Sequence, residues 1–155
     1  MPNVEMNPVR FDELSELALN MREADRREVF RSSGLTPENS LQRALERSDW
    51  VRSGRVNGRL VCLYGLSEID KSMGVGSPWM LGTDLVEECG VTVLRQSKAV
   101  IDEMLREYPV LMNYVDAENE VSIRWLEWLG FAIGEPEILG AMSHPFRRFE
   151  MRRYV

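Results

Sequence analysis

The stretch Asn119–Phe131, which reads NEVSIRWLEWLGF, directly follows the apolar run Val110–Val115. A short apolar run of this length is typical of a buried strand. Asn119 is a residue type that often caps a helix, because its side chain accepts a hydrogen bond from an otherwise unpaired amide. Together the two segments predict a strand, a short polar turn, a helix and then Gly-Phe at fixed offsets.

The helix predicted after Asn119 has two distinct faces. Glu120, Arg124 and Glu127 recur at helical spacing and form one exposed stripe. We expect the apolar side chains of the other face to be largely buried against the neighbouring strands: Trp125, Trp128 and Leu129.

The first third of the chain predicts one strand and two helices. The segment 4–9 is typical of a short strand. A second helix begins after Thr36, because an N-cap residue followed by Pro37 marks a helix start. The first helix is predicted from apolar residues at helical spacing: Phe11, Leu14, Ala18 and Met21.

A β-hairpin is predicted around Asn57-Gly58, since this dipeptide supplies the positive φ angles of a type I′ turn between the segments 50–56 and 59–66. The order β-α-α-β-β-β-α-β-α-β-β predicts an α/β (α+β) fold, a single domain over 1–155 with a mixed, mostly antiparallel sheet flanked by helices. The remaining expected elements are a loop at 71–78, a strand at 79–83, a helix ending at Tyr108 before Pro109, and strands at 110–115, 132–137 and 147–152.

Composition restricts the class of protein. The 155 residues suffice for one core and carry a net charge of −6, which argues against nonspecific nucleic-acid binding. We expect no membrane span and no signal peptide, and therefore a cytoplasmic protein. Cys62, expected in a strand, and Cys89, expected in a loop, lack the number and spacing of a disulfide framework or zinc site, so we expect reduced thiols and no metal.

The basic end of the chain, 146–154, interleaves arginines with aromatic residues. Contact with RNA or with an acidic partner surface is one interpretation. We favour the other, an edge strand whose outward arginines prevent pairing with further chains.

The segment 119–131 resembles the motif N-x-x-(A/S)-x-x-(L/W)-Y-x-x-x-G-F near the carboxyl end of the GCN5-related N-acetyltransferases (GNAT). Ser122 and Trp125 are accepted types, and the spacing to Gly130-Phe131 matches without insertion. The resemblance implies transfer of an acyl group from acetyl-CoA to an amine. One position departs, because Leu126 stands where the family usually has the tyrosine that protonates the leaving thiolate, and an alkyl side chain offers no proton.

The segments 79–84, 111–115 and 119–131 also resemble GNAT-like proteins of short-tailed bacteriophages, including a small internal virion protein. This narrower resemblance implies a location in the host cytoplasm, with packaging in the virion as a further option. It also opens an alternative to catalysis, in which the protein is a non-catalytic virion-associated protein or binds a host protein.

The family holds the CoA pyrophosphate with a glycine-rich loop, and here that region, 84–96, keeps only Gly90 and carries three carboxylates. We therefore expect acetyl-CoA to bind weakly or not at all, with a dissociation constant above about 0.1 mM. Arg95, Gln96 and Lys98 would offset part of this repulsion, while Glu87 and Glu88 would be harmless in a solvated loop. The resemblance implies a cofactor-binding set of Leu81, Thr83, Arg95, Gln96, Asn119, Ser122 and Leu126.

The candidate catalytic residues are few. Asp84 or Glu87 is a candidate general base, reached through water from the end of a strand, and Ser122 or a water would replace the missing tyrosine. Asn119 has a second interpretation as a helix cap that needs no cofactor, which we favour. His144, the only histidine, lies in a predicted loop without a recognisable partner and is interpreted as plain surface.

Overall fold

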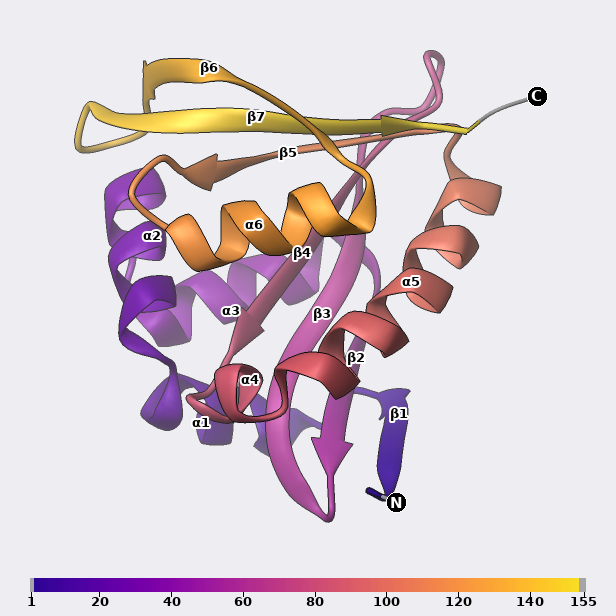
Figure 1. Ribbon diagram of the computed structural model, residues 1–155. Helices are drawn as coiled ribbons and strands as arrows, with labels where there is room; N and C mark the ends of the chain where they lie inside the picture. The colour runs from indigo at the N-terminus through magenta and orange to yellow at the C-terminus, as the bar shows by residue number, and fades with distance from the viewer. Residues whose placement is uncertain (1, 154–155) are drawn as a thin grey trace.

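The computed structural model describes residues 2–153, in which seven strands form one sheet in the order β1-β2-β3-β4-β5-β7-β6 (Figure 1). Neighbouring strands are antiparallel except β4 and β5, which are parallel. The strands are β1 (Val4–Pro8), β2 (Ser48–Val56), β3 (Arg59–Asp70), β4 (Val75–Gly82), β5 (Val110–Asp116), β6 (Ala132–Leu139) and β7 (His144–Arg152).

Helices cover both faces of the sheet. The first three helices pack on one face, and α5 and α6 cross the other (Figure 1). The helices are α1 (Phe11–Asn20), α2 (Glu23–Ser33), α3 (Pro37–Arg47), α4 (Leu85–Glu88), α5 (Gly90–Glu107) and α6 (Glu120–Leu129). None of them, within the part of the chain that the structure describes, is long and apolar enough to cross a membrane.

Each face of the sheet has its own hydrophobic cluster. Leu17 and Leu41 pack with Leu63 under the first three helices, and all three side chains are buried. Met104 and Leu111 belong to the cluster under α5 and α6. The central strands therefore bury side chains in both directions, which fixes their register.

The pairing of β4 with β5 is very short. Only two residue pairs join the strands, Val75 with Val110 and Gly76 with Leu111. The strands then separate toward their carboxyl ends, as in a letter V (Figure 1). Gly76 is needed at this apex, because a Cβ there would lie 2.5 Å from Cδ2 of the buried Tyr108.

Several local predictions are confirmed. Asn57 and Gly58 have φ angles of 52° and 78° and join β2 to β3. The Thr36 side chain accepts a hydrogen bond from the Asn39 amide, and Asn119 caps α6 by accepting one from the Ser122 amide. The α/β fold with one mixed sheet is also confirmed.

Three expectations about the elements are wrong. Three helices, not two, separate β1 from β2, because α2 follows α1 after a break at Met21 and Arg22. The fourth strand begins at Val75, inside the predicted loop at 71–78. The final strand is not an edge strand, since β7 lies between β5 and β6 and leaves β6 at the edge; Tyr154 of the basic segment lies outside the described residues.

The burial expected for Trp128 is also wrong. Its side chain is 52% exposed, and the Lys98 ammonium lies 4.2 Å from the centre of its ring. Trp125 is half-buried and packs against the cluster under α5 and α6. Trp128→Ala should therefore cost far less than a core truncation.

We predict that Gly76→Ala destabilises the protein by about 1–3 kcal/mol, because the methyl group must displace Tyr108 at the apex of the V. Gly134→Ala is the matched control, since a Cβ there meets its nearest atom, the Arg148 carbonyl oxygen, at an ordinary 3.5 Å. Urea denaturation of both variants measures the difference. Equal stability of the two would show that the apex tolerates a side chain.

Candidate functional site

A cavity of about 520 Å³ lies where β4 and β5 part. Residues of α2 and α3 line it on one side of the sheet, and residues of α5 and α6 line it on the other. Met80 of β4 and Tyr114 of β5 are among the strand residues that line it between these sides. Two molecules approaching from opposite sides of the sheet can meet in such a space.

The separation exposes one edge of β4 to the cavity. Thr83 donates its amide to the Val61 carbonyl, so the alternation of an antiparallel ladder turns the backbone of Pro78, Met80 and Gly82 toward β5. The Asn113 side chain donates to the Pro78 carbonyl at 2.8 Å. Because pairing with β5 ends at Gly76, no strand among residues 2–153 pairs with the Met80 amide and carbonyl on this side.

Acidic side chains of α2 occupy the open end of the V. Asp25 accepts the Gly82 amide of β4 at 2.8 Å, and Glu28 accepts the Asp116 amide of β5 at 2.7 Å. Helix α2 thus supplies to each strand an acceptor that the other strand no longer provides. These bonds satisfy backbone donors that would otherwise be left without a partner.

Glu28 has a raised pKa near neutral pH. Burial is the main cause and, together with the nearby carboxylates of Asp25 and Asp116, raises the pKa of Glu28 to about 7 against the lowering effects of the Asp116 amide bond and of Arg22. Glu28 also lines the cavity. A carboxyl group in this condition exchanges protons readily at physiological pH.

Arg22 is buried between β4, α4 and α6, and its side chain is only 5% exposed. Its Nε and Nη2 donate to the Asp25 carboxylate at 2.9 and 3.1 Å, and Nη2 also donates to Ser122 Oγ at 2.9 Å. Its Nη1 lies 3.6 Å from Glu87 Oε1. The guanidinium therefore joins the end of β4 to the first turn of α6, across the opening of the V.

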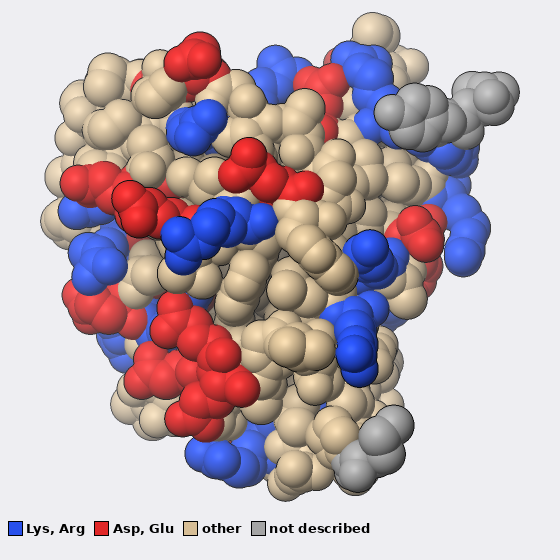
Figure 2. Space-filling model, viewed as in Figure 1, with Lys and Arg blue, Asp and Glu red and all other residues tan. Residues whose placement is uncertain are grey.

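The segment between β4 and α5 is a helical turn, α4, in place of a glycine-rich loop. Its exposed carboxylates belong to Asp84, Glu87 and Glu88, and Figure 2 shows acidic side chains gathered over this part of the surface. The ring of Trp125 lies near Gly90, 3.7 Å from where a Cβ would sit, so α6 closes on the start of α5.

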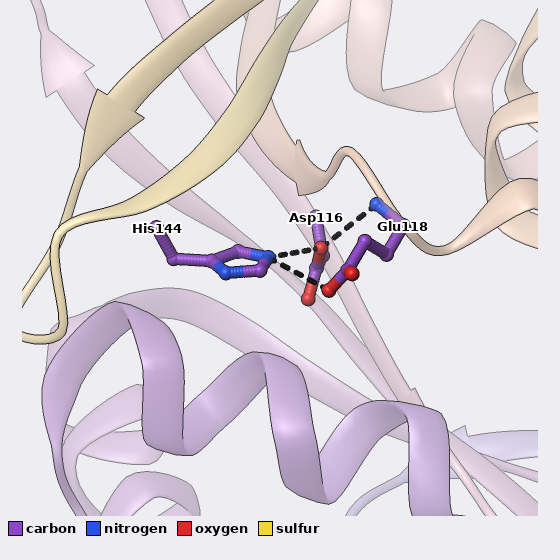
Figure 3. A group of neighbouring side chains, drawn as sticks. All are labelled: Asp116, Glu118 and His144. Carbon is purple, nitrogen blue, oxygen red and sulfur yellow. Dashed lines mark hydrogen bonds and ion pairs between the residues drawn. The ribbon is translucent and has the colours of Figure 1, made fainter.

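His144 is not plain surface, which corrects the expectation from the sequence. Its side chain is 15% exposed, and Nε2 lies 2.7 Å from Asp116 Oδ1 and 3.3 Å from Glu118 Oε2 (Figure 3). These three residues have the types and spacing of metal ligands. A cation already lies among them, because Arg31 Nη1 donates to Asp116 at 2.8 Å and to Glu118 at 2.6 Å.

Asp116 is the buried centre of this cluster. Burial raises the pKa of the Asp116 carboxyl, but the hydrogen bonds from the Glu118 amide, Arg31 and His144 outweigh it and hold the pKa below its ordinary value. Asp116 is therefore ionised at neutral pH and ties β5 and β7 to α2. This cluster is a structural ion-pair network beside the cavity.

Only some of the residues that the sequence analysis proposed for the site line the cavity. The expected residues that line the cavity are Leu81, Gln96, Ser122 and Leu126. Asn119 lies next to Ser122 through its cap. Arg95 is exposed and is absent from the lining, and the Thr83 hydroxyl donates to the Leu60 carbonyl.

The two proposed bases also lie elsewhere. Asp84 and Glu88 line a different hollow, with Glu16 and Asn20 of α1. Glu87 lies 3.6 Å from Arg22 and does not line the cavity, so its interpretation as part of a solvated loop without contacts is wrong, while its role as base stays a prediction.

Sequence reasoning missed the charged residues of α2. Arg22, which precedes α2, and Asp25, Glu28 and Arg31 recur every three residues, so each charged side chain lies next to the one before it on a stripe that winds around the helix. A search for apolar periodicity ignores such a stripe. The regular spacing of charges is the signal by which this helix could have been found.

No family model and no curated protein sequence matches the chain. Solved structures do match it. Spermidine N-acetyltransferase from Vibrio cholerae, in complex with CoA and spermine, has a TM-score of 0.74 and 12% identity, with 97% of this chain and 95% of that chain covered. AAC(6')-Ib in complex with ribostamycin and CoA has a TM-score of 0.73 and 13% identity, with 97% and 94% covered.

The protein α-N-acetyltransferase RimL in complex with CoA also matches, with a TM-score of 0.73 and 9% identity over 97% of this chain and 94% of that chain. At these identities the likeness concerns the fold. The chain has the fold of the GNAT acetyltransferases, as the sequence motif indicated.

We predict that Glu28 makes stability depend on pH. Its folded-state pKa of about 7 lies above the ordinary value of 4.5, so the folded state binds the proton more tightly and loses stability as pH rises through 7. Relative to Glu28→Gln, which cannot ionise, the wild type should lose about 1–3 kcal/mol of unfolding free energy between pH 5 and 8.

Urea denaturation at pH 5, 6, 7 and 8 tests this expectation. Glu127→Gln, which removes an exposed carboxylate from α6, is the control and should follow the wild type at every pH. A constant difference between wild type and Glu28→Gln would mean that Glu28 ionises normally.

Proposed function

We propose that the protein is an N-acyltransferase that moves an acyl group from acetyl-CoA or a related thioester to an amine. The observation that carries the proposal is the cavity between β4 and β5, which has an unpaired strand edge on one wall and a carboxyl group titrating near pH 7 on another. The CoA complexes among the structural neighbours support acyl-CoA as the donor.

The donor thioester fits the side of the cavity between α5 and α6. An extended chain such as the pantetheine arm pairs readily with a free strand edge, and Met80 offers both an amide and a carbonyl there. The Met80 amide is also a suitable donor to the thioester carbonyl oxygen, on which negative charge develops as the amine attacks. Because this amide belongs to a paired strand of the sheet, its direction is fixed in advance.

Glu28 is the proposed general base, in place of Asp84 and Glu87. An amine attacks only after it loses its proton, and a base with a pKa near 7 is about half ionised at neutral pH. Glu28 reaches the cavity from the α2 side, opposite the proposed donor side. An acceptor bound on the α2 side would therefore present its nitrogen between Glu28 and the thioester.

Water is the proposed source of the proton for the departing thiolate. Leu126 stands where the resembled family carries a tyrosine and lines the cavity, but it has no proton to give. Ser122, the other candidate, lies about one turn before Leu126, and its Oγ accepts a hydrogen bond from Arg22 Nη2 at 2.9 Å, at the guanidinium end of the site. The missing side-chain acid is therefore expected to limit turnover.

The acceptor side favours a cationic amine, since its carboxylates outnumber the two guanidiniums that pair with them. The carboxylates are those of Asp25, Glu28, Asp116 and Glu118, and the guanidiniums are those of Arg22 and Arg31. A small-molecule polyamine or an amine of a protein matches this charge, and spermine and ribostamycin bound to structural neighbours support the small-molecule class. We retain acetyl-CoA binding as weak, because the carboxylates of α4 replace the glycine-rich loop.

A second candidate function is a non-catalytic role as a phage protein that is virion-associated or binds a host protein. Two observations favour it. Trp125 lies against the start of α5, on the donor side. Phe30 and Met142 are 53% and 44% exposed, which is apolar surface available to a protein partner.

We predict that Glu28→Gln lowers kcat for acetyl transfer to spermidine by about 10²–10⁴-fold, because it removes the base and keeps the acceptor for the Asp116 amide. Thiol release from acetyl-CoA measures the rate. Wild-type activity should rise with pH to a plateau above about 7, and the variant should lack this rise.

Acetyl-CoA affinity should be unchanged in Glu28→Gln, since the residue lies on the acceptor side. Glu120→Gln, at the exposed start of α6, is the control and should keep kcat within about 3-fold of the wild type. Full activity of Glu28→Gln would exclude Glu28 as the base.

Leu126→Tyr should raise turnover, by about 10-fold or more, because a phenol placed in the cavity supplies the missing acid. Folding should be nearly unaffected if the cavity has room for the ring. If the second candidate function holds, the ring should cost about 1–3 kcal/mol and give no activity. A stable variant that binds CoA without any gain in turnover would contradict this expectation and point to Ser122 as the proton source.

A further inference from the structure

We propose that Arg22 and the first turn of α6 form a buried anion-binding subsite, which holds the phosphate oxygens of CoA in place of a glycine-rich loop, and that Glu87 competes with the ligand for Arg22. The inference rests on the proposed function, because it assigns the donor's phosphates to a place in the same cleft.

The strongest observation is an unmatched donor on Arg22. The side chain is 5% exposed, yet its Nη1 has no hydrogen-bond partner among the described residues. The carboxylate oxygen Glu87 Oε1 lies 3.6 Å from this nitrogen, beyond hydrogen-bond distance. Buried guanidinium nitrogens normally have acceptors, and Arg22 lines the cavity.

A second unmatched donor belongs to the same network. Asn119 Oδ1 caps α6 by accepting the Ser122 amide, and its Nδ2 is buried without a partner among the described residues. Ser122 connects the two, since its Oγ accepts from Arg22 Nη2. Two spare donors therefore flank Ser122 at the N-terminus of a ten-residue helix, where the helix dipole also favours an anion.

The chemistry of the site matches phosphate oxygens. A guanidinium presents a fixed fork of donors that suits phosphate geometry. Arg22 cannot move freely toward solvent, because Asp25 holds its other face and its own amide is bonded to the Gly82 carbonyl. The subsite therefore lies at a fixed place between the end of β4 and α6, beside the segment that joins β4 to α5.

Glu87 acts as the internal competitor. It is 58% exposed and attached to Arg22 by a single loose contact, so an incoming phosphate can replace it without unfolding α4. Its neighbour Glu88 carries the same charge on the same turn but lines the hollow beside α1. The two residues form a matched pair in which only Glu87 touches Arg22.

The test compares Glu87→Gln with Glu88→Gln by calorimetry at constant ionic strength, using CoA and pantetheine as probes. Pantetheine has the same thiol arm without phosphates. We expect Glu87→Gln to tighten CoA by about 5–20-fold, because it removes a like charge next to the phosphates. Glu88→Gln should tighten CoA by less than about 2-fold, and neither variant should change the affinity for pantetheine.

Arg22→Lys adds a second readout, since it keeps the charge and loses the fork. It should weaken CoA and leave pantetheine unchanged. Circular dichroism checks that the variant is folded. If it is not, the comparison of Glu87→Gln with Glu88→Gln alone tests the phosphate subsite. Inorganic pyrophosphate should compete with CoA in the wild type and more strongly in Glu87→Gln.

Two results would overturn the inference, and they differ in what else they overturn. Equal effects of the two glutamate variants, or tightening of pantetheine as much as CoA, would remove the phosphate subsite and leave the proposed acyltransferase intact. Absence of binding of both CoA and pantetheine to the wild type and to every variant would remove the proposed function together with the subsite.

Discussion

The early separation of β4 and β5 determines most of what this molecule can do. Two residue pairs hold the strands together, and the backbone groups that face the gap beyond Gly76 and Leu111 need other partners. Hydrogen-bonding groups of the main chain are costly to leave unpaired in a protein interior. The fold meets this cost with side chains at the end of the V and leaves the middle open as a cavity.

Helix α2 is the element that makes the open V stable. Its Asp25 and Glu28 each accept an amide from a different strand, and its Arg31 ties the end of β5 to the β7 residue His144 through Asp116. The same side chains give the cavity its acidic wall. Glu28, which accepts an amide at the edge of β5, is therefore also able to accept a proton, because burial raises its pKa to about 7.

Arg22 also has more than one role at the open end of the V. Arg22 pairs with the buried Asp25 and donates to Ser122 of α6, so one guanidinium stabilises the acidic wall and joins it to the first turn of α6. Its remaining nitrogen is what a phosphate would need. The absence of a glycine-rich loop is thus compatible with a CoA ligand that binds weakly and depends on Arg22.

Much of the fold could be predicted from the sequence, and much less of the site. The Asn57-Gly58 turn and the Asn119 cap depend on local chemistry, which a sequence shows directly. Helix α2 was not predicted, because the side chains that it turns toward the sheet include charged ones. The position of β7 inside the sheet depends on strand order, which no local pattern encodes. Trp128 was misjudged because a helix with apolar residues on several sides does not reveal which of them meets the sheet.

Amide hydrogen exchange at Met80 tests the central claim, that the edge of β4 is open and pairs with the donor thioester. Without ligand, we predict fast exchange at Met80 and slow exchange at Leu81, whose backbone points toward β3. Saturation with acetyl-CoA should slow exchange at Met80 by at least about 10-fold and leave Leu81 unchanged. A Met80 amide that is already protected, or that exchanges equally fast with and without saturating acetyl-CoA, would contradict the claim.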